Sequence, residues 1–137
     1  MSDPAVSLVD RPLRIVAVDD DPGIRALLEV TIGLDPRFQL VGMAASAADV
    51  VVQVAEAGRD APVDVVLVDV SLPDGNGIEV LPELRALAPN ARIALFTGWS
   101  DAETAERALA AGADAVYEKT GDPIRTLEQL CSLHQPA

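Results

Sequence analysis

Short apolar runs alternate with longer amphipathic stretches along the chain, and this alternation limits the folds that it can adopt. The runs are rich in Val and Ile, and the first, third and fourth are apolar almost without interruption. Such runs are typical of strands that are buried on both faces of a sheet. The five runs cover residues 13–18, 38–43, 63–68, 92–96 and 115–117. We therefore expect five buried strands.

Each run is followed by a stretch that begins with residues typical of a helix start. Two stretches open with Asp-Pro, two with a Ser that precedes an acidic residue by three positions, and one with glycine. Pro82 is expected near the end of the first turn of its helix, where a proline can bend the axis. The helix after Ser100 has mainly alanine on its inner face, so we expect it to be the most weakly anchored. The expected starts are Asp21-Pro22, Ser46, Gly77, Ser100 and Asp122-Pro123.

A strand–helix unit repeated with short connections predicts a parallel sheet with helices on both faces. Five units are too few for an eight-stranded barrel, so we expect an open, doubly wound α/β sheet. The 137 residues suffice for one domain. We place an N-terminal arm at residues 1–12, the domain at residues 13–134 and a C-terminal tail at residues 135–137.

The charged and reactive residues argue against several classes of function. Twenty-two acidic residues and ten basic ones give a net charge of −12, whereas nucleic acids and anionic membranes attract an excess of Lys and Arg. The single histidine, His134, and the single cysteine, Cys131, argue against a Ser-His-Asp triad and against multi-His or Cys-based metal sites. Residues 1–12 do not resemble a signal peptide, and no apolar run is long enough to span a bilayer. We expect a soluble, cytoplasmic protein.

Polar residues follow the predicted strands at the points where the strands end. Asp19 and Asp20 follow the first strand, Asp69 the third, Thr97 the fourth, and Lys119, the single lysine, follows the fifth after one intervening residue. Ligands bind at the carboxyl ends of the strands of an open parallel sheet. Three carboxylates gathered there repel one another unless a cation lies among them, and oxygen ligands suit Mg²⁺. With a lysine and a hydroxyl to contact phosphoryl oxygens, one carboxylate could accept a phosphoryl group as an aspartyl phosphate.

Each of these residues also has an ordinary structural explanation when it is taken alone. An Asp after a strand is commonly a helix N-cap, a Thr at a strand end fits its strand propensity, and a lone Lys is commonly solvated. The coincidence of all four positions favours a built site. The turn at residues 71–77 contains one proline and two glycines, and it can bring a backbone carbonyl towards the metal.

These motifs resemble those of the receiver domains of bacterial two-component response regulators, from Arg14 to about Leu133. That family has an acidic pair after its first strand, a phosphoacceptor aspartate after its third, a Pro-containing turn that ends in Asp or Asn before Gly, a hydroxyl residue and a lysine. The matching residues are, in order, Asp19, Asp20, Asp69, Pro73, Asn76, Gly77, Thr97 and Lys119. The resemblance implies a flavodoxin-like sheet of five strands in the order 2-1-3-4-5.

The resemblance also implies a role for each residue of the site. Asp20 and Asp69 would bind Mg²⁺ through their side chains, Ser71 through its backbone carbonyl, and Asp19 through a metal-bound water. Asp69 would accept a phosphoryl group from the phosphohistidine of a sensor histidine kinase or a phosphotransfer protein. Such a chain is not a conventional enzyme, because it catalyses only its own phosphorylation and dephosphorylation.

Lys119 and Thr97 would contact the oxygens of the phosphoryl group, and reorientation of Thr97 would signal the phosphorylated state. The expected output is a change in a protein-interaction face formed by the fourth helix, the fifth strand and the fifth helix. A phosphorylation-dependent homodimer is one expected use of that face.

Some positions depart from the family's usual pattern. The residue three positions before the lysine is commonly aromatic but is Val116 here, and Tyr117 comes one position later, on the other face of its strand. Thr120 replaces the proline that often follows the lysine. Trp99 either replaces the switch aromatic or covers the end of the fourth strand. Because neither Ser71 nor Trp99 offers a carboxylate or an amide to position water, we expect slow self-dephosphorylation.

Two other functions stay open at this point. A Mg²⁺-dependent phosphohydrolase of the haloacid-dehalogenase type would use the same aspartyl phosphate, but it would need an Asp where Ser71 stands. A phosphorylation-independent interaction module would retain the site as a relic. Residues 35–42 resemble the subgroup of receivers that usually carry a helix-turn-helix DNA-binding domain, so we expect either a stand-alone receiver or a part of a longer regulator.

Overall fold

Five parallel strands form the central sheet of the computed structural model, which describes residues 11–98, 102–119 and 122–134. The order of the strands is β2-β1-β3-β6-β7, which is the predicted order once the two strands of a separate hairpin are set aside. Each strand begins and ends within two residues of its predicted range. The strands are β1 (Leu13–Val18), β2 (Phe38–Ala44), β3 (Val65–Asp69), β6 (Arg92–Thr97) and β7 (Ala115–Glu118).

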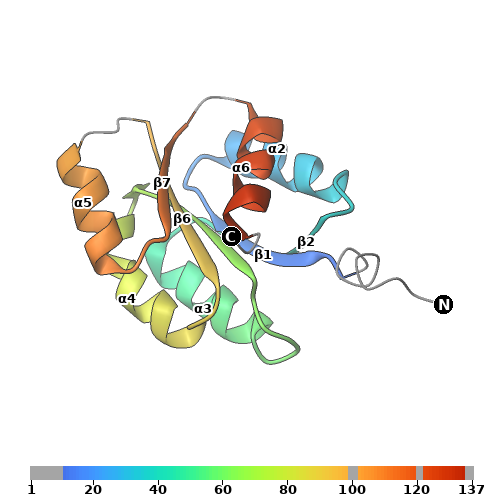
Figure 1. The fold of residues 1–137 in the computed structure, drawn as a ribbon, viewed down its shortest axis with the longest axis horizontal. Helices are drawn as coiled ribbons and strands as arrows, with labels where there is room; N and C mark the ends of the chain where they lie inside the picture. Colours follow the sequence, from blue (N-terminus) through green and yellow to red (C-terminus); the bar gives the residue numbers. More distant parts are fainter. Residues whose placement is uncertain (1–10, 99–101, 120–121, 135–137) are drawn as a thin grey trace.

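Helices cover both faces of this sheet (Figure 1). On one face α2 and α6 bury Leu28 and Leu127 in a core that they share with the sheet. On the other face α3, α4 and α5 surround a second core, which contains Val54 and Leu81. The helices are α2 (Pro22–Gly33), α3 (Ala47–Ala57), α4 (Gly77–Leu87), α5 (Ala102–Ala111) and α6 (Pro123–His134). This is the three-layered, doubly wound α/β arrangement that was predicted.

Local capping residues explain where the helices begin. The side chains of Asp21, Ser46 and Asp122 each accept one or two backbone N–H groups from the first turn of the following helix. Asn76 has the same role at the start of α4. Such side chains satisfy N–H groups that lack a partner within the helix. The start expected at Ser100 lies outside the described residues.

Pro82 lies further into its helix than the sequence predicted. Pro82 is the sixth residue of α4, so it lies in the second turn rather than near the end of the first, and the helix continues to Leu87. A proline at this position removes one helical hydrogen bond. Leu81 and Leu84 are fully buried on either side of it, and their packing holds the helix across the proline.

Asp64 links the N-terminal ends of β1 and β3. Residues 63–64 were predicted as the start of the third strand, but they precede β3. The Asp64 carboxylate accepts the backbone N–H of Arg14 at 2.8 Å and the guanidinium of Arg11 at 2.8 Å. These contacts hold Arg11, which lies in the expected N-terminal arm, against the sheet. Residues 1–10 of that arm lie outside the described residues.

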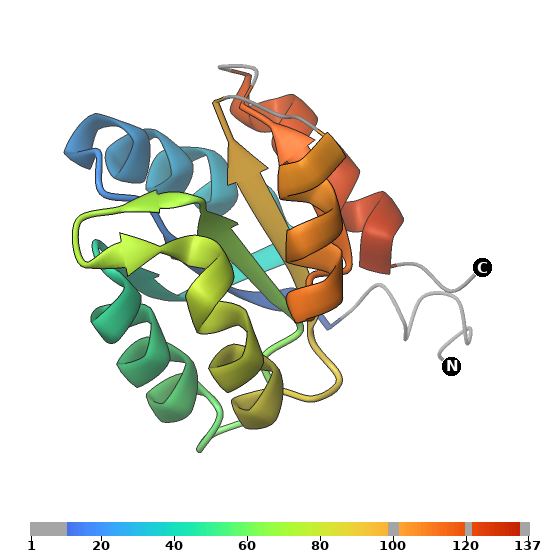
Figure 2. The same cartoon turned by 90° about the vertical axis from the view of Figure 1, so that its left-hand side faces the viewer.

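A small antiparallel hairpin, which was predicted only as a tight turn, follows β3. Its strands are β4 (Ser71–Leu72) and β5 (Gly75–Asn76), with Ser71 opposite Asn76. Gly75 has a φ of +151°, a value that residues with a Cβ rarely adopt. Figure 2 shows this hairpin beside the start of α3.

The helix that was expected to be weakly anchored, α5, is held by small side chains. Its buried residue is Ala108, whereas α4 buries Ile78, Leu81 and Leu84 among others. Because the hydrophobic contribution scales with the apolar area removed from water, a buried Ala contributes much less than a buried Leu. The difference in anchoring agrees with the prediction.

Candidate functional site

The residues that follow the strands lie together at one edge of the five-stranded sheet. Asp19 and Asp20 follow β1, Asp69 ends β3, Thr97 ends β6, and Lys119 follows β7. One carboxylate oxygen from each of the three Asp residues lies within 4.8 Å of the other two. The sequence-predicted acidic cluster is therefore present as a cluster in space, on the edge where open parallel sheets bind ligands.

The loop after β1 positions the first two carboxylates differently. Asp19 is buried, and its Oδ1 accepts the backbone N–H of Asp21 at 2.9 Å. Its backbone carbonyl accepts a hydrogen bond from the Arg25 guanidinium at 2.8 Å. Asp20, by contrast, is exposed. The sequence reasoning missed Arg25, because nothing in the local pattern links a residue inside α2 to the carbonyl that precedes the helix.

Asp69 is the most enclosed carboxylate of the cluster, with 3% of its surface exposed. Its Oδ1 accepts the backbone N–H of Ser71 at 3.1 Å, and its Oδ2 lies 3.0 Å from Lys119 Nζ. Burial raises the pKa of the Asp69 carboxyl; the ion pair with Lys119 opposes this rise, and the negative charge of Asp19 adds to it. Without a further cation the cluster carries more negative charge than its one ammonium group offsets.

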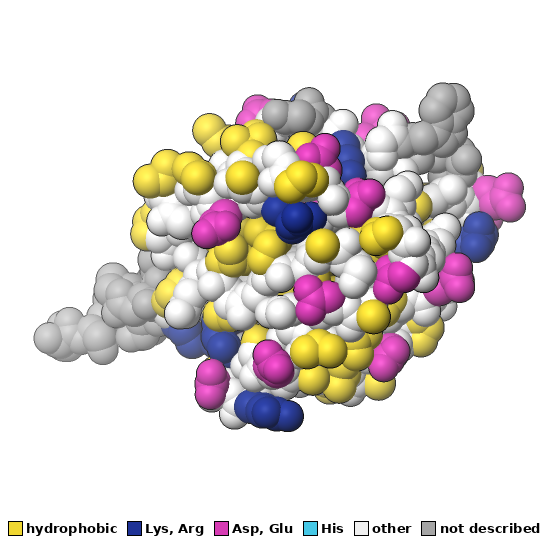
Figure 3. Space-filling model, turned by 180° about the vertical axis from the view of Figure 1, so that it is seen from behind, with side chains coloured by type: hydrophobic (Ala, Val, Ile, Leu, Met, Phe, Trp, Pro, Cys, Tyr) yellow, Lys and Arg dark blue, Asp and Glu magenta, His cyan; other side chains and the backbone are white. Residues whose placement is uncertain are grey.

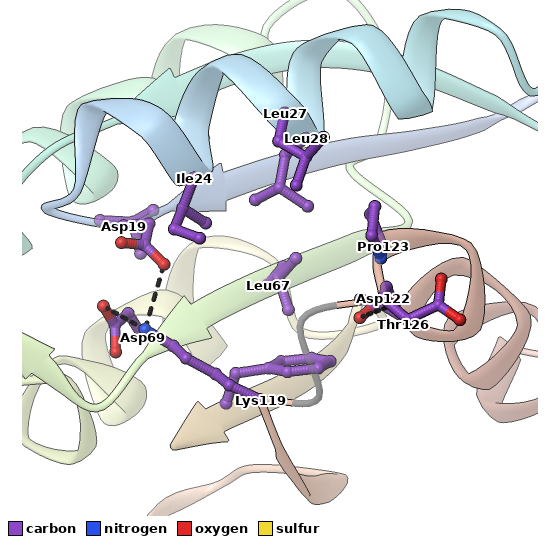
Figure 4. A pocket seen from close by; sticks show the side chains of 12 residues that line it. Asp19, Ile24, Leu27, Leu28, Leu67, Asp69, Lys119, Asp122, Pro123 and Thr126 are labelled. Atoms are coloured by element: carbon purple, nitrogen blue, oxygen red, sulfur yellow. Dashed lines mark hydrogen bonds and ion pairs between the residues drawn. The ribbon is translucent and has the colours of Figure 1, made fainter. Parts of the chain in front are cut away.

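Lys119 joins two of the carboxylates from the opposite side of the site (Figure 4). Its Nζ lies 3.2 Å from Asp19 Oδ2 as well as 3.0 Å from Asp69 Oδ2. Burial by itself would lower the pKa of the Lys119 ammonium, but the two carboxylates outweigh that effect and raise the pKa. Lys119 is therefore protonated in the neutral pH range and supplies a fixed positive charge to the site.

Thr97, at the end of β6, and Ser71, at the start of β4, are the remaining predicted site residues. Thr97 is buried, and its backbone carbonyl accepts the N–H of Lys119 at 2.9 Å, which ties the ends of β6 and β7 together. Ser71 is exposed in β4 and contacts Asp69 through its backbone N–H. The structure thus places the five other predicted site residues at the same edge of the sheet as Asp69.

The glycine of the family motif is required by a close approach of two backbone segments. A Cβ at Gly77 would lie 2.1 Å from the backbone carbonyl oxygen of Asp69. The N–H of Gly77 donates to the carbonyl of Val70 at 2.7 Å. Only a residue without a side chain lets α4 begin so near the end of β3.

Comparison with known proteins assigns the family. A model of the response regulator receiver domain matches residues 15–130. The chain belongs to this family. It is 35% identical over 107 residues to the DNA-binding transcriptional activator DevR/DosR of Mycobacterium tuberculosis. The aligned residues make up 78% of this chain and 48% of that protein. The chain spans about half the length of such curated relatives.

Two solved structures agree with the assignment. A CheY-like response regulator receiver domain protein from Methanospirillum hungatei superposes with a TM-score of 0.77 at 27% identity, covering 89% of this chain and 93% of the other. A two-component response regulator of the LuxR family from Aurantimonas gives a TM-score of 0.75 at 29% identity, covering 90% of this chain and 85% of the other. The chain is therefore a two-component receiver domain with a CheY-like, flavodoxin-like fold.

Tyr117 of this receiver domain lies on the opposite face of β7 from Val116, the position at which the family pattern led us to expect an aromatic residue. Val116 packs with the core under α3, α4 and α5, whereas Tyr117 packs with the core under α2 and α6. The rings of Tyr117 and Phe96 lie 5.4 Å apart at 54°. The pairing of β6 with β7 runs without a register shift, so no bulge returns Tyr117 to the other face. Trp99 and Thr120 lie outside the described residues.

An apolar pocket of about 130 Å³ adjoins the carboxylates of the receiver domain, between α2 and the start of α6 (Figure 4). Asp69 and Lys119 line one end of it, and Asp122 and Thr126 line another part. Its apolar walls come from Ile24, Leu27, Leu28, Leu67, Phe96 and Pro123. The charged site is therefore bordered on this side by a surface with low polarity, which strengthens the ion pairs of Lys119.

One face of the receiver domain carries scattered charges (Figure 3). On the face seen in Figure 3, acidic side chains are interspersed with hydrophobic ones, and basic side chains are isolated among them. Exposed apolar side chains include Leu27 and Val30 on α2 and Leu34, which caps the C-terminus of that helix. None of the helices within the described residues combines the length and the apolar character that crossing a bilayer requires.

Proposed function

We propose that Asp69 accepts a phosphoryl group from the phosphohistidine of a sensor histidine kinase or phosphotransfer protein. The observation that supports this most strongly is the buried Asp69 carboxylate with Lys119 Nζ 3.0 Å from its Oδ2. A carboxylate oxygen forms the new bond to phosphorus while the phosphorus–nitrogen bond of the donor breaks. The bonding electrons stay on the imidazole nitrogen, which takes its proton from solvent. Lys119 faces the negative charge that moves onto the phosphoryl oxygens.

We propose further that the acidic cluster binds Mg²⁺. The ligand set would be the side chains of Asp20 and Asp69 and the backbone carbonyl of Ser71, with Asp19 acting through a bound water. One oxygen from each of the three carboxylates lies within 4.8 Å of the other two, which supports this assignment, as does the exposure of Asp20 to solvent. Asp19 Oδ1 already accepts the Asp21 N–H, which suits a more distant role. When bound, Mg²⁺ would neutralise charge on the transferring group.

The proposed output is a change in the face formed by α5, β7 and α6. A phosphoryl group on Asp69 adds about 1.5 to 2 negative charges next to Thr97 and Lys119. New contacts from these residues would bias α5, which is anchored by Ala108, between two arrangements. We propose that this face binds a partner or a second copy of the chain. We place the protein in the cytoplasm, where histidine kinases present their phosphorylated domains.

Phosphorylation in vitro tests the assignment of Asp69. Incubation with Mg²⁺ and a small-molecule phosphodonor should add one acid-stable, base-labile phosphoryl group, measured by intact mass. The addition should be lost in Asp69→Asn and retained in the control Asp60→Asn, which removes an exposed carboxylate outside the cluster. Labelling of Asp69→Asn to the wild-type extent would refute the assignment.

The same experiment separates the two rival functions. Rapid multiple turnover of varied phosphate esters would favour a phosphohydrolase. An absence of labelling, even with Mg²⁺ and a cognate kinase, would favour an interaction module that does not use the site. Size-exclusion chromatography with light scattering, before and after phosphorylation, would then test for the homodimer.

A further inference from the structure

The hairpin that carries Ser71 is too short to be stable by itself. β4 and β5 have two residues each, and they make one pair opposite Ser71 and one opposite Leu72. Isolated two-stranded hairpins are marginal in water even when they are longer. Leu72 is largely buried and anchors β4 against the core, but residues 73–75 at the tip are exposed. Another contact is therefore needed to hold the tip.

Asp74, at the tip of the hairpin, makes this contact with α3. Its Oδ1 accepts the backbone N–H of Ala47 at 2.7 Å, and its Oδ2 accepts that of Ala48 at 2.9 Å. Both carboxylate oxygens are used, and 26 or 27 residues separate the partners along the chain. Figure 2 shows the hairpin and the start of α3 next to each other, as these bonds require.

α3 has a separate N-cap. The Ser46 hydroxyl accepts the N–H of Asp49, and the Ser46 carbonyl accepts the N–H of Val50. Asp74 satisfies the two N–H groups at the start of the helix that Ser46 leaves unpaired. The backbone N–H groups of Ala48 and Ala47 lower the pKa of Asp74, which keeps it charged at neutral pH. The Asp74 contact is thus additional to the ordinary cap and joins two separate elements.

We propose that Asp74 is a positioning residue for the Mg²⁺ site, acting through the hairpin on Ser71. Asp74 holds the tip, β4 and β5 transmit that restraint over three residues, and Ser71 at the base donates its N–H to Asp69 Oδ1. The Ser71 carbonyl belongs to the ligand set proposed above, so this inference rests on the proposed function. Residues that orient metal ligands affect metal affinity without touching the ion.

Direct measurement of Mg²⁺ affinity tests the proposal without phosphorylation. We suggest titration calorimetry of the unphosphorylated full chain with MgCl₂, for the wild type, Asp74→Ala and Asp74→Asn. Asp74→Ala should weaken Mg²⁺ binding about tenfold, the lower end of the range for residues that orient metal ligands. Asp74→Asn keeps one acceptor oxygen and should weaken binding less. Because both variants remove the same charge, a difference between them isolates the hydrogen bonds.

Two controls separate positioning from general stability and from charge. Ser46→Ala removes the other cap of α3; it should lower Tm but change the Mg²⁺ affinity less than about twofold. Glu79→Gln removes an exposed charge from the first turn of α4 and should likewise leave the affinity unchanged. Hydrogen exchange of the Ala47 and Ala48 amides should accelerate in Asp74→Ala.

The outcomes are distinguishable. Wild-type Mg²⁺ affinity in Asp74→Ala, equal losses in Asp74→Ala and Asp74→Asn, or an equal loss in Ser46→Ala would each overturn the positioning role while leaving the proposed function in place. An absence of Mg²⁺ binding by the wild type would instead overturn the proposed metal site, and this inference with it.

Discussion

Gly77→Ala is the substitution whose effect follows most directly from the structure. The added Cβ would lie 2.1 Å from the Asp69 carbonyl oxygen and 3.0 Å from Val68 Cγ1. Real Cβ atoms essentially never approach a neighbour within 3.0 Å, so the start of α4 and the end of β3 must separate by at least 0.9 Å. The nearest atom is backbone, so no side-chain rotation can relieve the contact.

This displacement should affect both stability and phosphorylation. Forcing an extra methyl group into a packed region costs about 1–3 kcal/mol, which urea unfolding at equilibrium would measure. The same shift moves the backbone of the proposed phosphoacceptor, and a misplacement of about 1 Å can cost on the order of 100-fold in rate. We therefore expect Gly77→Ala to show both a lower free energy of unfolding and a strongly reduced rate of labelling with Mg²⁺ and a small-molecule phosphodonor.

Gly33→Ala is the matched control. Gly33 is the last residue of α2, and a Cβ there would meet nothing within 4 Å. Alanine favours a helix over glycine by up to about 1 kcal/mol, so this variant should be as stable as the wild type or more stable, and should be labelled at the wild-type rate. If Gly77→Ala unfolds at the same urea concentration as Gly33→Ala and is labelled as fast, the close approach of Gly77 to Asp69 does not constrain this receiver domain.

Four further predictions concern the charged residues. Burial raises the pKa of Asp69 in the folded state. The stability that this group contributes is therefore lost as the pH rises from the pKa of the unfolded chain, about 3.9, through the pKa of the folded protein. Asp69→Asn should raise Tm at about pH 7 and change it little at about pH 3. Mg²⁺ should raise the Tm of the wild type by mass action, and this increase should be much smaller in Asp20→Asn. Lys119→Ala should keep the circular dichroism spectrum of the fold but slow phosphorylation by about 10²-fold, and an unchanged rate would contradict the role of its ammonium group. Asp64→Ala leaves the partly buried N–H of Arg14 without its carboxylate partner, so chemical denaturation should show a loss of about 1 kcal/mol while Mg²⁺ affinity stays constant.

The sheet and most helix starts could be predicted because their signals are local. Continuous Val-rich runs mark strands buried on both faces, and a residue such as Asp21 caps the helix that immediately follows it. The parallel arrangement then brings Asp19, Asp69 and Lys119 to one edge, so the grouping of the site was also predictable.

Contacts between distant segments could not be predicted in the same way. The bonds from Arg25 to the Asp19 carbonyl and from Asp74 to the start of α3 depend on how loops approach helices in space. No period or spacing in the sequence records those approaches. The hairpin at residues 71–76 was missed for a similar reason, since a strand of two residues is too short to produce an alternating pattern.

The link between Asp64 and Arg11 has a practical consequence for attaching the protein to other molecules. Arg11 is held at the N-terminal end of β3, whereas Asp69 lies at its C-terminal end. At about 3.3 Å per residue, the strand separates the two by roughly 17 Å. A dye, a surface tether or a fusion partner attached directly before Arg11 would thus emerge at the end of the sheet opposite to the carboxylates. The end of the sheet that carries Asp69 would stay open to a kinase.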